Sequence, residues 1–123
     1  KKREFYLGKN KEKIKFKTFR ARHGEIMSSA YIFEKTAYIP DCNDLSIVRI
    51  KDLRNLNVLI LDCLKIGSHP SHFNLNQSLF VHHLLKPKKT ILINLHYDLD
   101  YDFLLKLVPN NVLPAYDGLS LNL

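Results

Sequence analysis

The sequence predicts a mixed α/β fold in which helices lie against one face of a single layer of sheet. Three observations carry this prediction. Charged and apolar residues alternate over residues 13–21, which is typical of a half-exposed strand. The apolar runs at 57–61 and 90–93 do not alternate and so predict strands buried on both faces. Helical patterns follow these runs, at 75–85 and 98–107.

The first half of the chain predicts antiparallel strands followed by a short helix. The strand at 13–21 changes phase near Phe19, as a β-bulge would cause. Residues 27–33 and 36–39 predict a hairpin. The spacing of apolar residues over 45–56 fits a short helix.

The helix at 75–85 has clear start and stop signals. Asn74 is a favourable N-cap, and Gln77, three residues later, completes a capping box. Lys86 followed by Pro87 ends the pattern, because proline cannot continue a helix.

The last elements are shorter. The helix at 98–107 carries three aspartates near its N-terminal end, where the helix dipole favours negative charge. Short strands are expected at 112–115 and 119–121. The order is therefore strand–helix–strand–helix–strand, preceded by antiparallel strands, which is a mixed α/β (α+β) arrangement.

Basic residues are concentrated near the N-terminus. Residues 1–22 contain ten Lys and Arg against two Glu, a net charge of +8, whereas the rest of the chain contains nine against ten Asp and Glu. We divide the chain into a basic segment, 1–12, and a domain, 13–123. A basic arm suits a small nucleic-acid-binding module. Lysines that alternate with Ile14 and Phe16 are also typical of a solvated strand face, and we favour that interpretation because no base-reading motif is present.

Membrane and secretion signals are not found in this sequence. No apolar run approaches the roughly 18–20 residues of a membrane span, and no apolar region follows the N-terminal charges. Cys42 and Cys63 do not form a Cys-x-x-Cys pair, so we expect reduced, buried thiols. These features predict a cytoplasmic protein that has no membrane partner.

Polar residues able to bind metal recur at or just past the predicted strand ends. In sheets built from strand–helix units these ends converge on one edge, where separate side chains assemble a site. His and Asp are also the residue types that hold divalent ions. Each residue alone has an ordinary alternative, as a turn, a cap or a water-facing side chain. The set consists of His23, Asp41, Asp62, His69, His72, Asn94 and His96.

Six motifs, in order along the chain, resemble a known family. They are Arg22-His23-Gly24, Ala37-Tyr38-Ile39-Pro40-Asp41, Leu61-Asp62-Cys63-Leu64-Lys65, His69-Pro70-Ser71-His72-Phe73-Asn74-Leu75, Leu95-His96-Tyr97-Asp98-Leu99-Asp100-Tyr101 and Pro114-Ala115-Tyr116-Asp117-Gly118-Leu119. Over residues 13–123 they resemble the C-terminal half of a metallo-β-lactamase-fold hydrolase. The branch they resemble includes the cyclic-phosphate diesterase of phosphonate breakdown.

The resemblance implies a fold and a chemistry. The fold would be an αββα sandwich with two divalent metals, zinc or manganese, at the edge between its sheets. His23 would be a ligand of the first metal, and Asp41 would bridge both. His72 would contact the substrate phosphate or donate a proton to the leaving oxygen, while a metal-bound hydroxide attacks phosphorus.

The sequence departs from the family pattern in two places. The family's last metal-ligand histidine falls on Asn94, whose carbonyl oxygen is a poorer zinc ligand than imidazole. His96, two residues later, is an alternative ligand. The H-x-H-x-D-H motif, which supplies most ligands of both metals in the family, is missing from this chain, and residues 1–22 contain no histidine.

We therefore expect a partial hydrolase of a small phosphodiester or related ester. It should be inactive by itself, because His23, Asp41 and one of Asn94 and His96 give three ligand groups, too few for two ions. Without a facing sheet, the chain should expose an apolar face that pairs with a separate N-terminal half or with a second copy. Two other interpretations stay open: a nucleic-acid-binding module that uses the basic segment, and a pseudo-enzyme kept for protein contacts.

Overall fold

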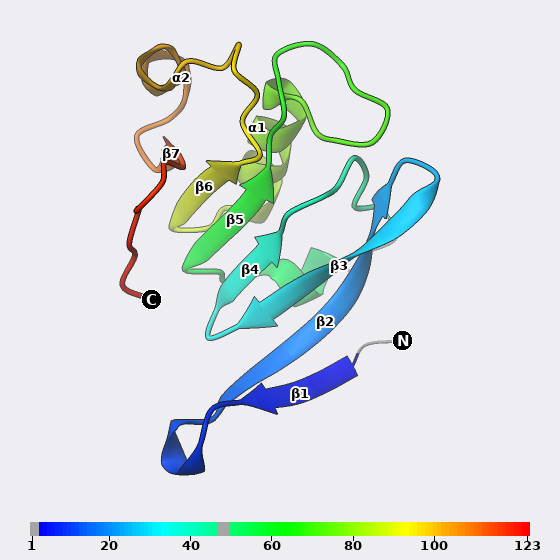
Figure 1. Cartoon of the computed structure of the whole chain (residues 1–123), viewed down its shortest axis with the longest axis vertical. Coiled ribbons are helices and arrows are strands. Elements are labelled where there is room, and N and C mark those ends of the chain that lie inside the picture. Colours follow the sequence, from blue (N-terminus) through cyan, green and yellow to red (C-terminus); the bar gives the residue numbers. More distant parts are fainter. Residues whose placement is uncertain (1–2, 47–49) are drawn as a thin grey trace.

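The computed structural model describes residues 3–46 and 50–123. Within them, seven strands form one sheet, ordered β1-β2-β3-β4-β5-β6-β7 as they occur in the chain (Figure 1). A single mixed sheet with helices was predicted, and the structure confirms it. The elements are β1 (Arg3–Leu7), η1 (Asn10–Glu12), β2 (Ile14–His23), β3 (Ile26–Phe33), β4 (Thr36–Ile39), η2 (Ile50–Leu53), β5 (Val58–Asp62), α1 (Leu75–Leu85), β6 (Lys89–Ile93), α2 (Tyr101–Leu107) and β7 (Val112–Pro114).

The sheet has an antiparallel part and a parallel part. Strands β1 to β4 pair antiparallel, and β4 to β7 pair parallel. The predicted hairpin is β3–β4, and its turn residues Glu34 and Lys35 have φ of 44° and 61°. Positive φ at both positions is what a type I′ turn requires, and this turn matches the twist of the strands it joins.

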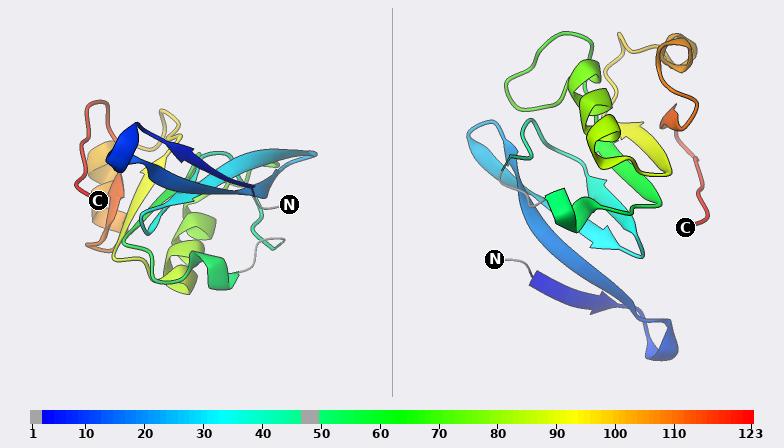
Figure 2. Two further views of the ribbon diagram at one scale, coloured as in Figure 1. Left: turned by 90° about the horizontal axis from the view of Figure 1, so that it is seen from below. Right: turned by 180° about the vertical axis from the view of Figure 1, so that it is seen from behind.

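Both helices pack on one face of the sheet. Leu59 and Leu61 of β5 belong to the same buried cluster as Val81 and Leu85 of α1. Leu92 of β6 and Leu104 of α2 share a second cluster. Figure 2 shows α1 lying along one side of the sheet. The prediction of helices against one face is therefore confirmed.

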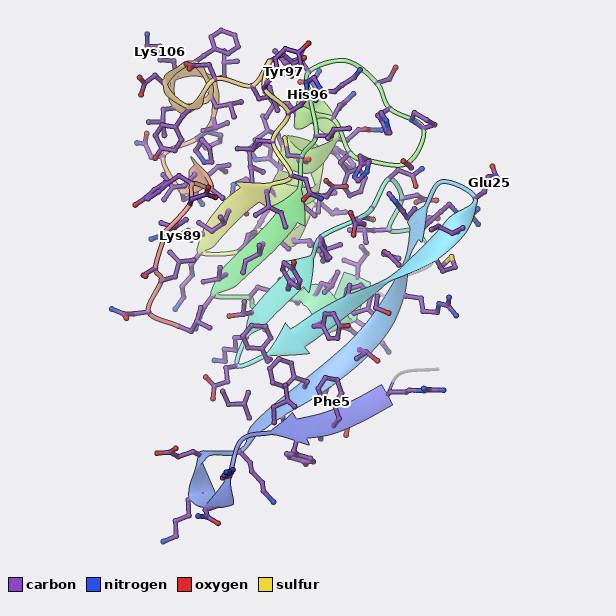
Figure 3. The ribbon with its side chains drawn as sticks, in the orientation of Figure 1. Phe5, Glu25, Lys89, His96, Tyr97 and Lys106 are labelled. Carbon is purple, nitrogen blue, oxygen red and sulfur yellow. The ribbon has the colours of Figure 1, made fainter. Side chains whose placement is uncertain are left out.

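The opposite face carries a group of aromatic side chains, which we call the open face. Tyr38 pairs with Ile60, which lies between Leu59 and Leu61 and so points away from α1. The rings contact one another in sequence, with centroids 5.2 Å apart for Phe5 and Phe16 and 4.8 Å apart for Phe16 and Phe33. Phe5 reaches from β1 toward these rings (Figure 3). None of the group is fully buried; its members are Phe5, Phe16, Tyr31, Phe33 and Tyr38.

Strands β1 and β2 differ from the expectation in two ways. Residues 3–7 have no clear hydrophobic period and were assigned only to the basic segment, yet they form β1, which pairs with β2 from Arg3 opposite Thr18 to Leu7 opposite Ile14. The bulge expected near Phe19 is wrong, because β2 pairs with β3 in unbroken register. The phase changes for another reason. One face of β2 is buried at Phe19, where α1 and η2 cover the sheet, and exposed nearer the start of the strand. The apolar pattern therefore changes along β2 without a bulge.

Three other predicted elements are shorter than expected or not found. Helix α2 starts at Tyr101 rather than at 98, because Asp100 acts as its N-cap and accepts a hydrogen bond from the Phe103 N–H. Of the helix predicted at 45–56, only η2 is helical, and residues 47–49 lie outside the described part of the chain. Residues 119–121 form no strand.

Glu4 of the basic segment forms ion pairs with two lysines of β2. The Nζ of Lys15 lies 2.7 Å from a carboxylate oxygen of Glu4 on the neighbouring strand, and that of Lys17 lies 3.9 Å from the other. These contacts agree with the interpretation of the lysines as a solvated strand face.

Two further observations concern compartment and redox chemistry. In the parts of the chain that the structure describes, no helix is both long and apolar enough to cross a membrane. Cys42 and Cys63 are free and buried, as expected. Burial raises the pKa of each thiol to about 12, so neither is a reactive thiolate near neutral pH.

Candidate metal centre

Three side chains from separate segments meet beyond the strand ends. His23 is the last residue of β2, Asp41 follows β4, and His72 lies in the loop between β5 and α1. Their ligand atoms all lie within 4.8 Å of one another, and each residue is partly buried. The rings of His23 and His72 meet edge to face, with centroids 4.6 Å apart. The structure thus brings together three of the residues singled out from the sequence.

The loop between β5 and α1 fixes the ring of His23. Its Nδ1 lies 2.7 Å from the carbonyl oxygen of Ser71, which can only accept, so Nδ1 carries the hydrogen and Nε2 keeps its lone pair. Gly24 has φ of +60°, and a Cβ there would lie 3.1 Å from the Cβ of Ser71. Glycine therefore permits the close approach of the two loops that this hydrogen bond needs.

Asp41 lies in a loop that is tied to the antiparallel strands. The Asn43 N–H donates to the carbonyl of Arg22 over 2.9 Å, and the side-chain oxygen of Asn43 accepts from the Gly24 N–H over 2.8 Å. The hydroxyl of Ser28 donates to the carbonyl of Asp41. These bonds hold the backbone at Asp41 and just after it.

A buried carboxylate orients His72. The Nδ1 of His72 lies 2.7 Å from Oδ2 of Asp62, and the same oxygen accepts from the Cys42 N–H over 3.0 Å. Asp62 is fully buried. Burial raises the pKa of Asp62, and the hydrogen bonds from Cys42 and His72 act against that rise. As with His23, the Nδ1–H is committed and Nε2 remains free.

Sequence reasoning noted Asp62 only as one strand-end residue and gave it no role. The available signal was its position directly after the apolar run of β5, where an aspartate must be buried and therefore needs donors. Which donors would reach it depended on loops whose paths the sequence did not specify.

The two candidates for the last ligand lie in different surroundings. The side-chain nitrogen of Asn94 lies 3.3 Å from Oδ1 of Asp41, at the edge of the centre. The Nδ1 of His96 instead lies 2.9 Å from Oδ1 of Asp98. The His96 ring packs against that of Tyr97, with the ring centroids 4.2 Å apart (Figure 3). His96 does not belong to the group formed by His23, Asp41 and His72.

The donor set fits one divalent cation. Two imidazole nitrogens and a carboxylate oxygen are ligands that zinc and manganese accept in proteins. Histidines that bind metal usually donate their other ring N–H to a carbonyl or a carboxylate, as His23 and His72 do here. We call this group of three residues the metal centre.

Comparison with known proteins gives four findings. The family model described as "Beta-lactamase superfamily domain" matches residues 2–97. A diphosphatase from the PhnP family is 30% identical in sequence and superposes with a TM-score of 0.83, over 96% of this chain and 46% of its own. The short form of human tRNase Z is 16% identical with a TM-score of 0.66, over 94% and 45%. No curated protein sequence matches the chain. The chain therefore spans less than half the length of these two solved structures.

Proposed function

Because the chain belongs to the beta-lactamase superfamily, we propose that it forms one half of a metal-dependent hydrolase of phosphodiesters or related esters. The meeting of His23, Asp41 and His72 is the observation that carries this proposal. The solved structures that the chain resembles, a diphosphatase and a tRNase, support phosphate bonds as the class of substrate.

The centre would hold zinc or manganese. When bound, such an ion supplies a nucleophile near neutral pH and neutralises negative charge on the phosphate. His23 and Asp41 would hold it, and the hydrogen bond to the carbonyl of Ser71 fixes the orientation of the His23 ring.

The Nε2 nitrogen of His72 has two proposed roles. In the chain by itself, His72 completes the group of three ligands, and Nε2 is the nitrogen left for a cation because Nδ1 contacts Asp62. In an assembled enzyme whose other half supplies further ligands, that nitrogen would be available to contact the substrate phosphate or, in the doubly protonated ring, to donate its proton to the leaving oxygen. In both states Asp62 holds the ring through Nδ1.

We propose that this chain alone is inactive. The centre offers three protein ligands, whereas two cations need on the order of eight to ten contacts, water included. The purified chain should therefore not hydrolyse bis(p-nitrophenyl) phosphate when metal is added. Turnover without a partner would overturn this part of the proposal.

The missing contacts would come from a polypeptide that covers the open face. The short span of the chain relative to the solved structures supports this. So do the partly exposed aromatic rings, because an apolar sheet face of this kind needs a partner. A separately expressed half of the same fold is the partner we propose, and a second copy of this chain would be its substitute.

A thermal melt followed by circular dichroism tests the centre. A ligand that binds only the folded chain, at 100 times its Kd, stabilises it by about 2.7 kcal/mol, so Zn²⁺ or Mn²⁺ should raise Tm. His23→Ala and Asp41→Ala should remove the rise. His83→Ala is the matched control, since His83 is exposed on α1 and lies outside the centre.

Phosphate recognition is tested separately. With Mn²⁺ bound, the chain should bind bis(p-nitrophenyl) phosphate in calorimetry, and the His23→Ala variant should not. An unchanged Tm with metal would contradict the metal centre. A metal-dependent rise in Tm with no binding of the phosphodiester would contradict the proposed class of substrate and leave the centre intact.

A further inference from the structure

The side chain of Asn94 lies between two carboxylates. Its Nδ2 donates to the carbonyl of Pro40 and lies 3.3 Å from Oδ1 of Asp41 and 3.2 Å from Oδ1 of Asp62. All three neighbours are oxygen atoms that accept hydrogen bonds. The reverse orientation would set the side-chain carbonyl of Asn94 against three oxygens. The amide nitrogen therefore faces the carboxylates.

The backbone holds Asn94 in this position. Its φ is 62°, in the left-handed region that asparagine tolerates better than most residues. On one side, the carbonyl of Ile93 accepts from the Cys63 N–H over 2.9 Å. On the other, the His96 N–H donates to the carbonyl of Leu64 over 2.8 Å. The loop after β6 is thus anchored on both sides of Asn94.

Asp62 is not free to act as a ligand. It is fully buried, and its Oδ2 already accepts from the Cys42 N–H and lies 2.7 Å from Nδ1 of His72. Its Oδ1 is the atom that Asn94 faces. On the side of Asp41 that faces Asp62, a second cation would therefore have to displace the Asn94 amide.

On the basis of the proposed metal centre, we propose that this chain binds a single divalent cation, on His23, Asp41 and His72. Asn94 is a positioning residue that replaces a second cation. Its two N–H hydrogens carry partial positive charge and are shared among the Pro40 carbonyl and the carboxylates of Asp41 and Asp62, so they hold the carboxylates together without any ion between them. This differs from the two metals that the sequence resemblance implied. The reason is that Asn94, at the position of an expected metal ligand, acts as a hydrogen-bond donor instead.

Metal stoichiometry tests the proposal. In Mn²⁺ titrations by calorimetry, the chain should bind one ion, and its electron paramagnetic resonance spectrum should be that of an isolated ion. Asn94→Asp replaces the donor with a third carboxylate, and oxygen ligands suit Mn²⁺. This variant should bind two ions and give the spectrum of a coupled pair. Asn94→Leu removes the donor without adding a ligand, so it should still bind one ion, about 10–100-fold more weakly.

Asn55→Asp is the matched control. Asn55 also has a left-handed backbone, with φ of 58°, and it is exposed and outside the centre, so its variant should match the wild type. Circular dichroism confirms that each variant is folded. Two ions on the wild-type chain, or one ion on both the wild type and Asn94→Asp, would overturn the role of Asn94. No ion on the wild-type chain would instead overturn the metal centre itself.

Discussion

The Oδ2 of Asp62 and the Nδ1 of His72 lie 2.7 Å apart, and the carboxylate has no exposed surface. This contact links the buried sheet to the metal centre. The core of β5 places Asp62, and Asp62 in turn sets the direction of the His72 ring. The strength of this link can be measured by changing the carboxylate to an amide.

Asp62→Asn should destabilise the folded chain by about 1–3 kcal/mol in the absence of metal. Whichever way the new amide turns, its NH₂ group meets a donor, either the Cys42 N–H on one side or the Asn94 amide on the other. Urea denaturation measures the loss. Asp117→Asn, at an exposed position, should change the free energy of unfolding very little. Equal stability of the two variants would show that Asp62 has no such role.

Asn74→Ala should cost about 1 kcal/mol of stability. Asn74 caps α1 by accepting from the Gln77 N–H over 2.9 Å, and the Gln77 side chain accepts from the Asn74 N–H over the same distance. Urea denaturation again gives the free energy. Asn76→Ala is the control, because Asn76 is exposed in the first turn of the same helix and makes no cap. A similar loss in both variants would contradict the capping box.

Acid should destabilise the chain through His82. Burial lowers the pKa of His82 below its ordinary value of 6.5, with the neighbouring His83 as a second cause. Below pH 6.5 the unfolded chain takes up a proton that the folded chain refuses, so stability falls as the pH drops toward the folded-state pKa. The slope from this one group is at most about 1.4 kcal/mol per pH unit.

Urea melts at several pH values measure this slope. His82→Gln should flatten the fall in stability below pH 6.5. His83→Gln, on the exposed side of α1, should retain most of it. A full slope in His82→Gln would assign the acid sensitivity to another group.

Tyr38→Lys should shift the chain toward the monomer if the open face drives self-association. Tyr38 is 36% exposed, and its ring lies 6.4 Å from that of Tyr31 on this face. A charge there must be desolvated when two faces meet. Sedimentation velocity measures the association. Tyr97→Lys is the matched control, because Tyr97 is 92% exposed and lies in the loop after β6. Equal effects of the two changes would exclude the open face as the surface of contact.

Local signals in the sequence predicted much of the fold. Helix α1 lies at 75–85 as expected, because a capping box marks its start and Lys86-Pro87 its end. Strands β5 and β6 lie within a residue of their predicted ranges, because apolar runs of this kind are buried wherever they pair. Strand β4 lies at its predicted range, because the hairpin turn sets it. Strand β1 was missed because its own short sequence has no pattern that predicts a strand. It is a strand because it pairs with β2.

The sequence predicted which strand ends carry the candidate site, but not the distances and contacts between its side chains. The sequence indicated that His23, Asp41 and His72 would lie at one edge, and the structure brings them together. The sequence could not show which of Asn94 and His96 would lie beside the centre. Their positions depend on the left-handed backbone of Asn94, just after β6, and on the pairing of His96 with Asp98. The role of Asp62 depends likewise on contacts between loops far apart in the chain.

The strands of this sheet stand side by side in the order in which they are translated. Each strand pairs with the one made just before it, and no later strand must be inserted between two earlier ones. The sheet can therefore grow by one edge at a time while the chain leaves the ribosome, with α1 and α2 closing over it as they emerge. Until those helices are complete, the newest edge is the part of the molecule most open to capture by a chaperone or by a neighbouring nascent chain.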